Sequence, residues 1–261
     1  MWVREVTGAV LFFLFSAGGT VHAATLTDAE LQEQLASFGA DFYIERIDAP
    51  TIRNVHDWVN RQAGYYKYPF VQGSDDGDEF QLEKHVPDNK SPDNAWTRHV
   101  GDTLVESFVT SDERDVLIVE EIDHKHGFRV VVEPGVHLPG GIEPGAVWEV
   151  EADLSVYELE DVSLSNNGKL EALHSYEGAF RIRTPAGEFD TILIREDFLL
   201  HVGPLKVDDD RLLFFARGVG LVAEVEGIKA SAILIFRMKE HSAKVLVEYP
   251  QAVGRTAAGG G

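Results

Sequence analysis

The chain changes to a strand-like pattern after Trp96, and this change constrains the fold more than any other feature. Runs rich in β-branched residues lie at 115–121 and 127–133, and seven more strand-like runs follow them. These seven occupy residues 146–154, 170–183, 188–196, 211–216, 220–226, 230–238 and 243–249. Most connections are short and contain Gly, Pro, Asn or Asp, which favours hairpins over helical crossovers. The sequence therefore predicts a mainly β (α+β) fold, with an antiparallel curved sheet or half-barrel over residues 97–250.

Two glycine-containing stretches resemble phosphate-binding loops, but their neighbouring residues favour hairpin turns. In RTPAGEFDT, Pro185 cannot donate to a strand ladder, and Gly187 adopts positive φ without steric cost. A phosphate-binding loop would have its glycines open a helix, whereas strand residues follow here. Gly218 and Gly220 also stand between two predicted strands. We therefore interpret both stretches as hairpin turns.

The segment 24–62 carries two helical patterns. Thr27, with Glu30 three residues later, has the spacing of a capping box, and apolar residues recur behind it at helical intervals. The second pattern covers 51–62, where Pro50 precedes the first turn. The sequence thus predicts two short N-terminal helices ahead of the sheet.

Between these helices and the sheet, residues 63–96 are polar and irregular. They include VPDNKSPDN, whose two Pro-Asp-Asn groups favour turns, so we predict a loop or linker. The aromatic cluster YYKYPF at 65–70 either covers an open sheet edge or lines a ligand groove or partner contact. The tail, 251–261, is predicted to be disordered.

The first residues have the layout of a secretory signal peptide. Arg4 precedes an apolar run, and small residues end at Ala23, so we predict a signal peptide over 1–23. The apolar run is shorter than the roughly 20 residues of a spanning helix, and no later stretch is long and apolar enough. A periplasmic or extracellular location is expected.

The absence of cysteine and the net charge each exclude classes of protein. A chain with no cysteine has no disulfide framework, no thiol catalysis and no lipid anchor on an N-terminal cysteine. The formal charge of −21 repels nucleic acid and anionic lipid headgroups, so we expect no nucleic-acid partner. The charge serves solubility or attracts a cation or basic partner, and the sequence leaves both readings open.

Histidines and acidic runs supply the candidate metal ligands. His124 and His126 would point to the same side of an extended strand, with His137 and Asp123 or Glu133 as further ligands. A solvated hairpin tip explains the pair equally. The acidic runs 74–79 and 208–210 offer oxygen ligands for Ca²⁺ without the EF-hand spacing, and solvated loops also explain them.

Motifs of nucleophilic and zinc-dependent hydrolysis are absent from the sequence. There is no G-x-S-x-G, S-x-x-K or H-E-x-x-H, so we expect neither an enzyme nor a cofactor.

Three stretches carry a family resemblance. They are HLPGGIEPGAVWEVE (137–151), YEGAFRIRTPAGEFDTILI (176–194) and LLFFARGVGLVAEVE (212–226). The chain here resembles a group of bacterial exported β-domains of largely unassigned function, similar to lipoprotein-carrier-like half-barrels of the cell envelope. The resemblance implies a role in envelope assembly, pilus biogenesis or lipid handling, and it brings no shared catalytic residues. Many relatives are anchored through a cysteine, which this chain lacks.

These observations favour a secreted or periplasmic, non-enzymatic binding protein. A curved sheet with helices on its concave face would make a groove that holds a lipid or other apolar small molecule by burial. Aromatic candidates for the lining, which would otherwise be plain core, are Trp148, Phe180, Phe189, Phe214 and Phe215. Two other classes stay open: a structural or interaction protein that docks an envelope or pilus protein, and a metal-dependent hydrolase.

Overall fold

The structure, a computed structural model, describes residues 26–59, 62–73, 79–91, 95–111, 115–134, 138–232 and 236–250. The predicted signal peptide at 1–23 and the predicted disordered tail at 251–261 lie outside these residues. In the part of the chain that is described, no helix has the length and apolar character that a membrane crossing requires.

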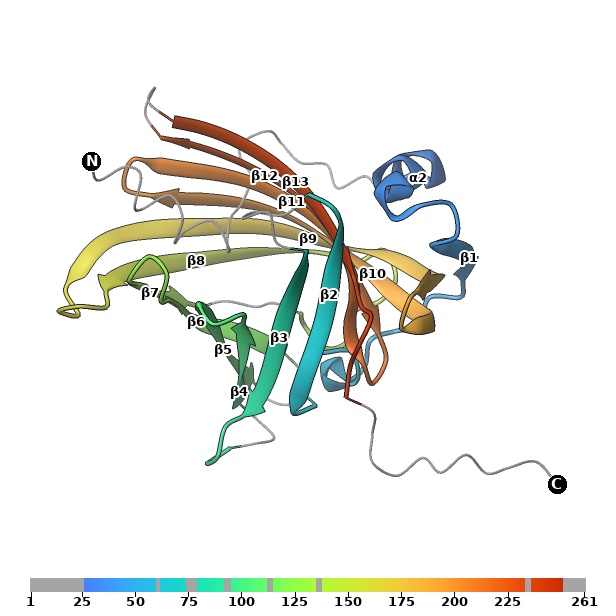
Figure 1. Cartoon of the computed structure of the whole chain (residues 1–261), viewed down its shortest axis with the longest axis horizontal. Helices are drawn as coiled ribbons and strands as arrows, with labels where there is room; N and C mark the ends of the chain where they lie inside the picture. The colour runs from blue at the N-terminus through green and yellow to red at the C-terminus, as the bar shows by residue number, and fades with distance from the viewer. Residues whose placement is uncertain are drawn as a thin grey trace.

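Twelve antiparallel strands form one closed barrel, in which each strand pairs with the next along the chain (Figure 1). The strands are β2 (Gly64–Gln72), β3 (Phe80–Pro87), β4 (Ala95–Val100), β5 (Leu104–Ser111), β6 (Asp115–Asp123), β7 (Phe128–Glu133), β8 (Val147–Glu158), β9 (Leu164–Thr184), β10 (Gly187–Val202), β11 (Leu205–Ala216), β12 (Gly220–Ala232) and β13 (Phe236–Val245). The barrel closes where β13 pairs with β2. A further strand, β1 (Tyr43–Ile47), pairs with the last part of β9, beyond the residues of β9 that pair with β8.

The predicted half-barrel is wrong, because the sheet closes on itself. Strands β2 and β3 lie inside the segment 63–96 that the sequence predicts to be a loop or linker, and they join β4 to β13. Two of the residues that β3 turns to the interior, Glu83 and His85, are polar and buried. No apolar alternation therefore marks this strand in the sequence.

The first predicted helix is present as α2 (Asp28–Leu35). The capping box is formed: the Glu30 carboxylate accepts the Thr27 N–H at 2.9 Å, and the Thr27 hydroxyl accepts the Glu30 N–H at 3.3 Å. A 3₁₀ turn, η2 (Ala36–Phe38), continues the helix. Thr27 and Glu30, the two residues that predict a helix start, therefore form the cap of the one α-helix among the described residues.

The second predicted helix, at 51–62, is wrong. Its described residues contain only one 3₁₀ turn, η3 (Val55–Asp57). The Asn54 side chain accepts the His56 N–H at 3.2 Å, a local bond that competes with helix formation. The apolar side chains of this segment do not lie along one face of a helix. Those of Ile52, Val55 and Trp58 are instead buried against the interior of the barrel.

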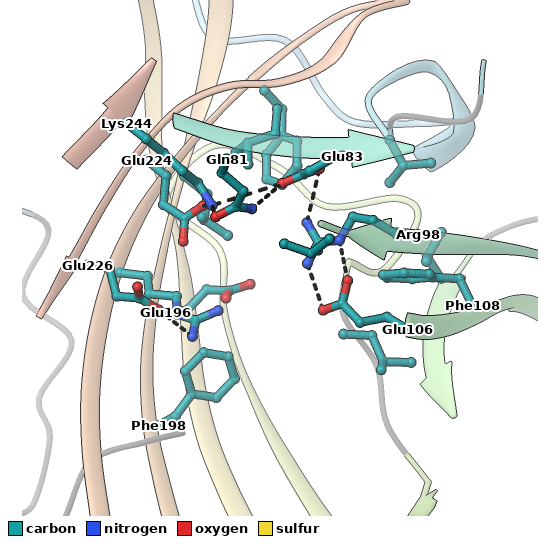
Figure 2. A pocket seen from close by; sticks show the side chains of 18 of the residues that line it. Gln81, Glu83, Arg98, Glu106, Phe108, Glu196, Phe198, Glu224, Glu226 and Lys244 are labelled. Atoms are coloured by element: carbon teal, nitrogen blue, oxygen red, sulfur yellow. Dashed lines mark hydrogen bonds and ion pairs between the residues drawn. The ribbon is translucent and has the colours of Figure 1, made fainter. Parts of the chain in front are cut away.

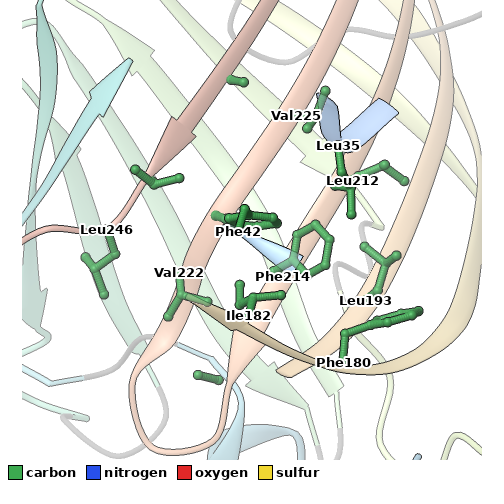
Figure 3. Packing of buried hydrophobic residues seen from close by; sticks show 14 of the residues in the cluster. Leu35, Phe42, Phe180, Ile182, Leu193, Leu212, Phe214, Val222, Val225 and Leu246 are labelled. Atoms are coloured by element: carbon green, nitrogen blue, oxygen red, sulfur yellow. The ribbon is translucent and has the colours of Figure 1, made fainter. Parts of the chain in front are cut away.

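Buried apolar side chains form three clusters. One fills the interior between β7 and β12 and includes Leu154, Leu170 and Val207. A second fills the other end of the interior, where Trp58 packs among strand residues such as Phe215. The third lies mainly between the outer wall and the segment with α2, and Figure 3 shows Leu35, Phe42 and Phe214 in it, with others.

The two predicted hairpin turns are confirmed. Thr184 pairs with Gly187 across a two-residue turn between β9 and β10, and Gly187 has a φ of 138°. β11 ends before Gly218, and β12 begins at Gly220. These glycines serve the geometry of the sheet and do not bind phosphate at a helix start.

Candidate functional site

The middle of the barrel interior is charged, and we call this zone the charged belt. Its side chains come from inward-facing positions on β3, β4, β5 and β10 to β13 (Figure 2). The belt consists of Glu83, Arg98, Glu106, Glu196, Arg211, Glu224, Glu226 and Lys244. Because successive residues of a strand face opposite sides, these charges share the inner face with the two apolar clusters at its ends.

Arg98 on β4 binds two carboxylates. Its Nε and Nη2 donate to the two oxygens of Glu106, the second bond measuring 2.7 Å, and its Nη1 lies 3.7 Å from Oε2 of Glu83. Burial alone would raise the pKa of Glu83, but Arg98, His85 and Lys244 lower it to about 2. Glu83 is therefore ionised at any physiological pH.

Lys244 on β13 crosses the seam at which the barrel closes. Its Nζ lies 2.8 Å from Oε2 of Glu224 on β12 and donates to Oε1 of Gln81 on β3 at 3.2 Å. The Gln81 amide in turn donates to Glu83 at 2.7 Å. Among the described residues, the β13–β2 ladder has two residue pairs, fewer than any other junction of the barrel, so these side chains reinforce its least paired junction.

Arg211 on β11 holds the opposite side of the belt. Its Nε donates to Oδ2 of Asp209 at 2.7 Å, and its Nη2 lies 2.5 Å from Oε1 of Glu226. One guanidinium therefore joins carboxylates from two neighbouring strands.

Several buried polar atoms beside the belt make no hydrogen bond with any described residue. They include both ring nitrogens of His85 and of His174, whose side chains are 4% and 1% exposed. Oε2 of Glu121 and the indole Nε1 of Trp148 are two more. Leaving such a group unsatisfied costs about 1–3 kcal/mol. Nε2 of His85 lies 3.6 Å from Oε2 of Glu83, and Nε2 of His174 lies 3.5 Å from Oε1 of Glu196, so carboxylates are the nearest charged groups to both rings.

Glu121 on β6 lies directly opposite Glu106 in the β5–β6 ladder, so both side chains share the inner face. Burial raises the pKa of Glu121 well above its ordinary value, and the neighbouring carboxylates of Glu106 and Asp123 raise it further. Beside the belt, the inner face therefore contains a carboxyl group that holds its proton tightly.

A cavity of about 120 Å³ lies against the belt. Most of the rest of its wall is apolar and includes Trp96, Phe108, Phe198 and Phe215, while Gln81, His85, His174 and Ser242 add polar side chains. A cavity of about 150 Å³ is enough to hold benzene, whereas sites for drug-sized ligands measure about 300–1,000 Å³. The cavity therefore suits a molecule of few atoms.

The five predicted aromatic candidates do not meet at one place. Phe215 lines the cavity, and Trp148 stacks on His174, which also lines it, with ring centres 5.1 Å apart. Phe180 and Phe214 belong to the cluster that includes α2, and Phe189 packs against the same cluster. Figure 3 shows Phe180 and Phe214 there.

The predicted metal ligands are dispersed. His126 bonds Asp123 through Nδ1 at 2.9 Å, and His124 lies exposed in the same turn, while His137 falls outside the described residues. Among the residues that are described, no three His, Cys, Asp or Glu side chains are arranged to hold a metal ion.

The acidic run 208–210 is not a solvated loop, because it lies inside β11. Asp209 points inward to Arg211, whereas Asp208 accepts from Lys229 Nζ at 2.7 Å on the outer side. Of the other acidic run, residues 74–78 fall outside the described residues.

The aromatic cluster at 65–70 is divided between the two faces of β2. Tyr66 and Tyr68 are buried, Phe70 lines the cavity, and Tyr65 is 57% exposed. The segment therefore contributes both to the interior and to the outer surface.

The charged belt was missed by sequence reasoning, although a signal for it exists. Charged or ionisable residues recur at every second position in strand-like runs, as in Glu83 and His85 or Glu224 and Glu226. That period places both members of a pair on one face. Which face is interior depends on closure of the barrel, which the sequence did not reveal.

Comparisons with known proteins give two likenesses among solved structures. A protein from Bacteroides fragilis, inferred to be exported and described as having a YmcC-like fold, matches with a TM-score of 0.39 and 8% identity, over 74% of this chain and 99% of its own. A protein from Parabacteroides distasonis, inferred to be a lipoprotein, matches with a TM-score of 0.38 and 12% identity, over 77% of this chain and 99% of its own.

At these identities and TM-scores, neither likeness bears on what the chain binds. No protein-family model matches the sequence, and no curated protein matches it.

Proposed function

We propose that the protein is an exported, non-enzymatic binding protein that holds a small molecule inside the barrel, beside the charged belt. The observation that carries this proposal is the cavity of about 120 Å³ with buried polar atoms on its wall that lack a hydrogen-bond partner. Binding sites typically combine an apolar wall with a few polar groups that orient the ligand, and this cavity has both.

One feature of the interior favours a lipid as the ligand, and another opposes it. The apolar cluster around Leu154, Leu170 and Val207 is a surface that an acyl chain would contact. The cavity volume of about 120 Å³ opposes a whole lipid, because it falls below the range of drug-sized sites. We therefore propose a ligand of few heavy atoms in place of a lipid.

Native mass spectrometry of the freshly purified protein tests the proposal. We expect a mass increment that denaturation removes. Ala172 lines the cavity, so Ala172→Phe should fill it and abolish the increment, whereas Val147→Phe, at a side chain that is 46% exposed, should retain it. A bound fatty acid, or uptake of a fluorescent fatty acid, would restore the lipid version. Equal retention by both variants would place the ligand outside the barrel.

A second candidate function, docking of an envelope protein, is favoured by one surface feature. Tyr65, Phe80 and Leu82 on the outer face of β2 and β3 are 57%, 44% and 39% exposed. Clustered exposed apolar side chains mark contact surfaces. If this surface docks a partner, Leu82→Ser should remove a protein that co-purifies from an envelope extract. Leu164→Ser, at a 51% exposed leucine on β9, should not.

A further inference from the structure

A row of polar side chains crosses the inner face of five neighbouring strands. Its members lie directly opposite one another in four successive antiparallel ladders, so their side chains are neighbours on one face. This polar row consists of His174 on β9, Glu196 on β10, Arg211 on β11, Glu226 on β12 and Ser242 on β13. All five side chains line the cavity.

The next inward-facing position on β8, β9 and β10 is apolar. Val150, Ala172 and Phe198 lie opposite one another there, and all three line the cavity. Leu170, which also lines the cavity, lies two residues from Ala172 on the same face. Two residues of a strand span about 7 Å, so a molecule of few atoms contacts the polar row and the apolar side chains together.

The polar row is accessible from the cavity at Arg211 and Glu226. Their side chains are 15% and 16% exposed, and because both point inward, this exposed surface faces the interior of the barrel. Figure 2 shows Glu226, Glu196 and Phe198 on the same side of the pocket. The Ser242 hydroxyl donates to Oε2 of Glu226 across 3.5 Å, longer than the 2.5–3.0 Å of an ordinary bond between oxygens. A shorter bond from a ligand improves on this contact.

An uncharged polar group suits the row better than an ion. Arg211 lies directly between Glu196 and Glu226, so it repels a cation, while the two carboxylates repel an anion. Burying a further ion also costs more than burying a hydroxyl group. A hydroxyl group both donates and accepts, so it complements a carboxylate that stands beside a guanidinium.

We propose that the ligand of the lumen is a short-chain primary alcohol, that is, one hydroxyl group on a short carbon chain. The hydroxyl group donates to Oε2 of Glu226, and the chain lies against Val150, Ala172 and Phe198. This proposal rests on the binding function proposed above and names the chemical class of the ligand.

Four probes of nearly equal size test the polar group: 1-butanol, 1-chlorobutane, butylamine and butyrate. Trp96 lines the cavity, so the NMR signal of its indole N–H reports on binding there. We expect 1-butanol to shift this signal and to bind about tenfold more tightly than 1-chlorobutane, the gain typical of a hydrogen bond to a charged group. Butylamine and butyrate should bind more weakly than 1-butanol.

Glu226→Gln locates the contact of the hydroxyl group. The variant keeps the shape of the side chain but removes its charge, so it should weaken 1-butanol at least about threefold and leave 1-chlorobutane unchanged. Unchanged binding of 1-chlorobutane also shows that the cavity is intact in the variant. Glu151→Gln removes a carboxylate from an exposed position on β8 and should change neither affinity.

Leu170→Ala locates the carbon chain. Leu170 is 6% exposed, so its truncation enlarges the apolar side of the cavity. In a series of 1-alkanols of increasing length, the chain length that binds most tightly should be longer in this variant than in the wild type. Leu164→Ala, at a 51% exposed leucine of the same strand, should keep the wild-type preference.

The outcomes separate the two proposals. If another probe binds as tightly as 1-butanol, if Glu226→Gln binds 1-butanol normally, or if Leu170→Ala keeps the wild-type chain length, the alcohol proposal is wrong while binding in the lumen stands. A co-purified molecule without a hydroxyl group has the same meaning. If no probe shifts the Trp96 signal and no molecule co-purifies, the proposed binding function itself fails.

Discussion

Arg98 is the residue whose removal should damage the barrel most. Arg98→Met leaves the buried carboxylates of Glu83 and Glu106 without their guanidinium, and breaking a buried pair in this way costs about 3–5 kcal/mol. Urea denaturation at neutral pH measures the loss. Arg183→Met is the matched control, because the pair between Arg183 and Glu188 is about half exposed and should contribute less than about 1 kcal/mol. Equal losses in both variants would contradict a structural role for the belt.

The depressed pKa of Glu83 gives this pairing a pH signature. The folded pKa of about 2 lies below the ordinary value of 4.5, so the stabilisation is full above pH 4.5 and is lost as the pH falls toward 2. The shift corresponds to about 3 kcal/mol at neutral pH. Arg98→Met should flatten the fall in stability between these two pH values. If the variant loses as much stability between pH 4.5 and pH 2 as the wild type, other carboxylates cause that loss.

Glu121 should behave in the opposite sense. Its folded pKa is raised above the ordinary 4.5, so its contribution to stability is full below pH 4.5 and is lost as the pH rises through the folded value. At neutral pH, Glu121→Gln should therefore raise the free energy of unfolding by about 1–3 kcal/mol. Urea denaturation at pH 4.5 and pH 8 checks this, and a gain that is larger at pH 4.5 would contradict it.

At the level of elements, the seam between β13 and β2 is expected to be the most sensitive junction of the barrel. A β-carbon at Gly73 would lie 2.2 Å from the carbonyl oxygen of His241 on β13, and Gly73 has a φ of +60°. Gly101 has a similar φ of +57°, with nothing within 4 Å of such a carbon. Gly101→Ala should cost only the backbone strain, about 1–2 kcal/mol.

Gly73→Ala should cost clearly more than Gly101→Ala, because the backbones of β2 and β13 must also separate. Hydrogen exchange should show faster exchange of the amides along β13 and β2 in this variant than in the control. Similar stability and exchange in both variants would mean that the seam tolerates separation.

At this scale, the sequence predicts those elements that depend on neighbouring residues, and it misses those that depend on contacts between distant strands. The capping box at Thr27 and the turn at Gly187 depend on residues next to them, and the structure contains both. Strand β3 depends on a barrel that closes around it, since Glu83 and His85 are interior only there. The prediction of calcium ligands or a solvated loop at 208–210 fails for the same reason. A run of acidic residues indicates exposure to solvent unless the buried partner of Asp209, Arg211, is known.

At the scale of the whole molecule, most interior charges are held in ion pairs, whereas the surface carries more acidic side chains than its exposed ion pairs neutralise. The formal net charge of −21 leaves the exposed acidic residues in mutual repulsion, which opposes the compact state. The ion pairs of Arg98 and Lys244 are shielded from salt by burial, whereas surface repulsion is screened over a distance of about 30 Å at 0.01 M salt and about 3 Å at 1 M.

Raising NaCl from 0.01 M to 1 M should therefore increase the Tm of the wild-type protein, because salt weakens the surface repulsion more than the buried pairing. The loss caused by Arg98→Met should stay the same at both salt concentrations, since the pair that it breaks is buried. Thermal denaturation followed by circular dichroism measures both. A Tm that falls with salt would mean that exposed ion pairs, such as that between Arg181 and Asp190, outweigh the repulsion among the remaining acids.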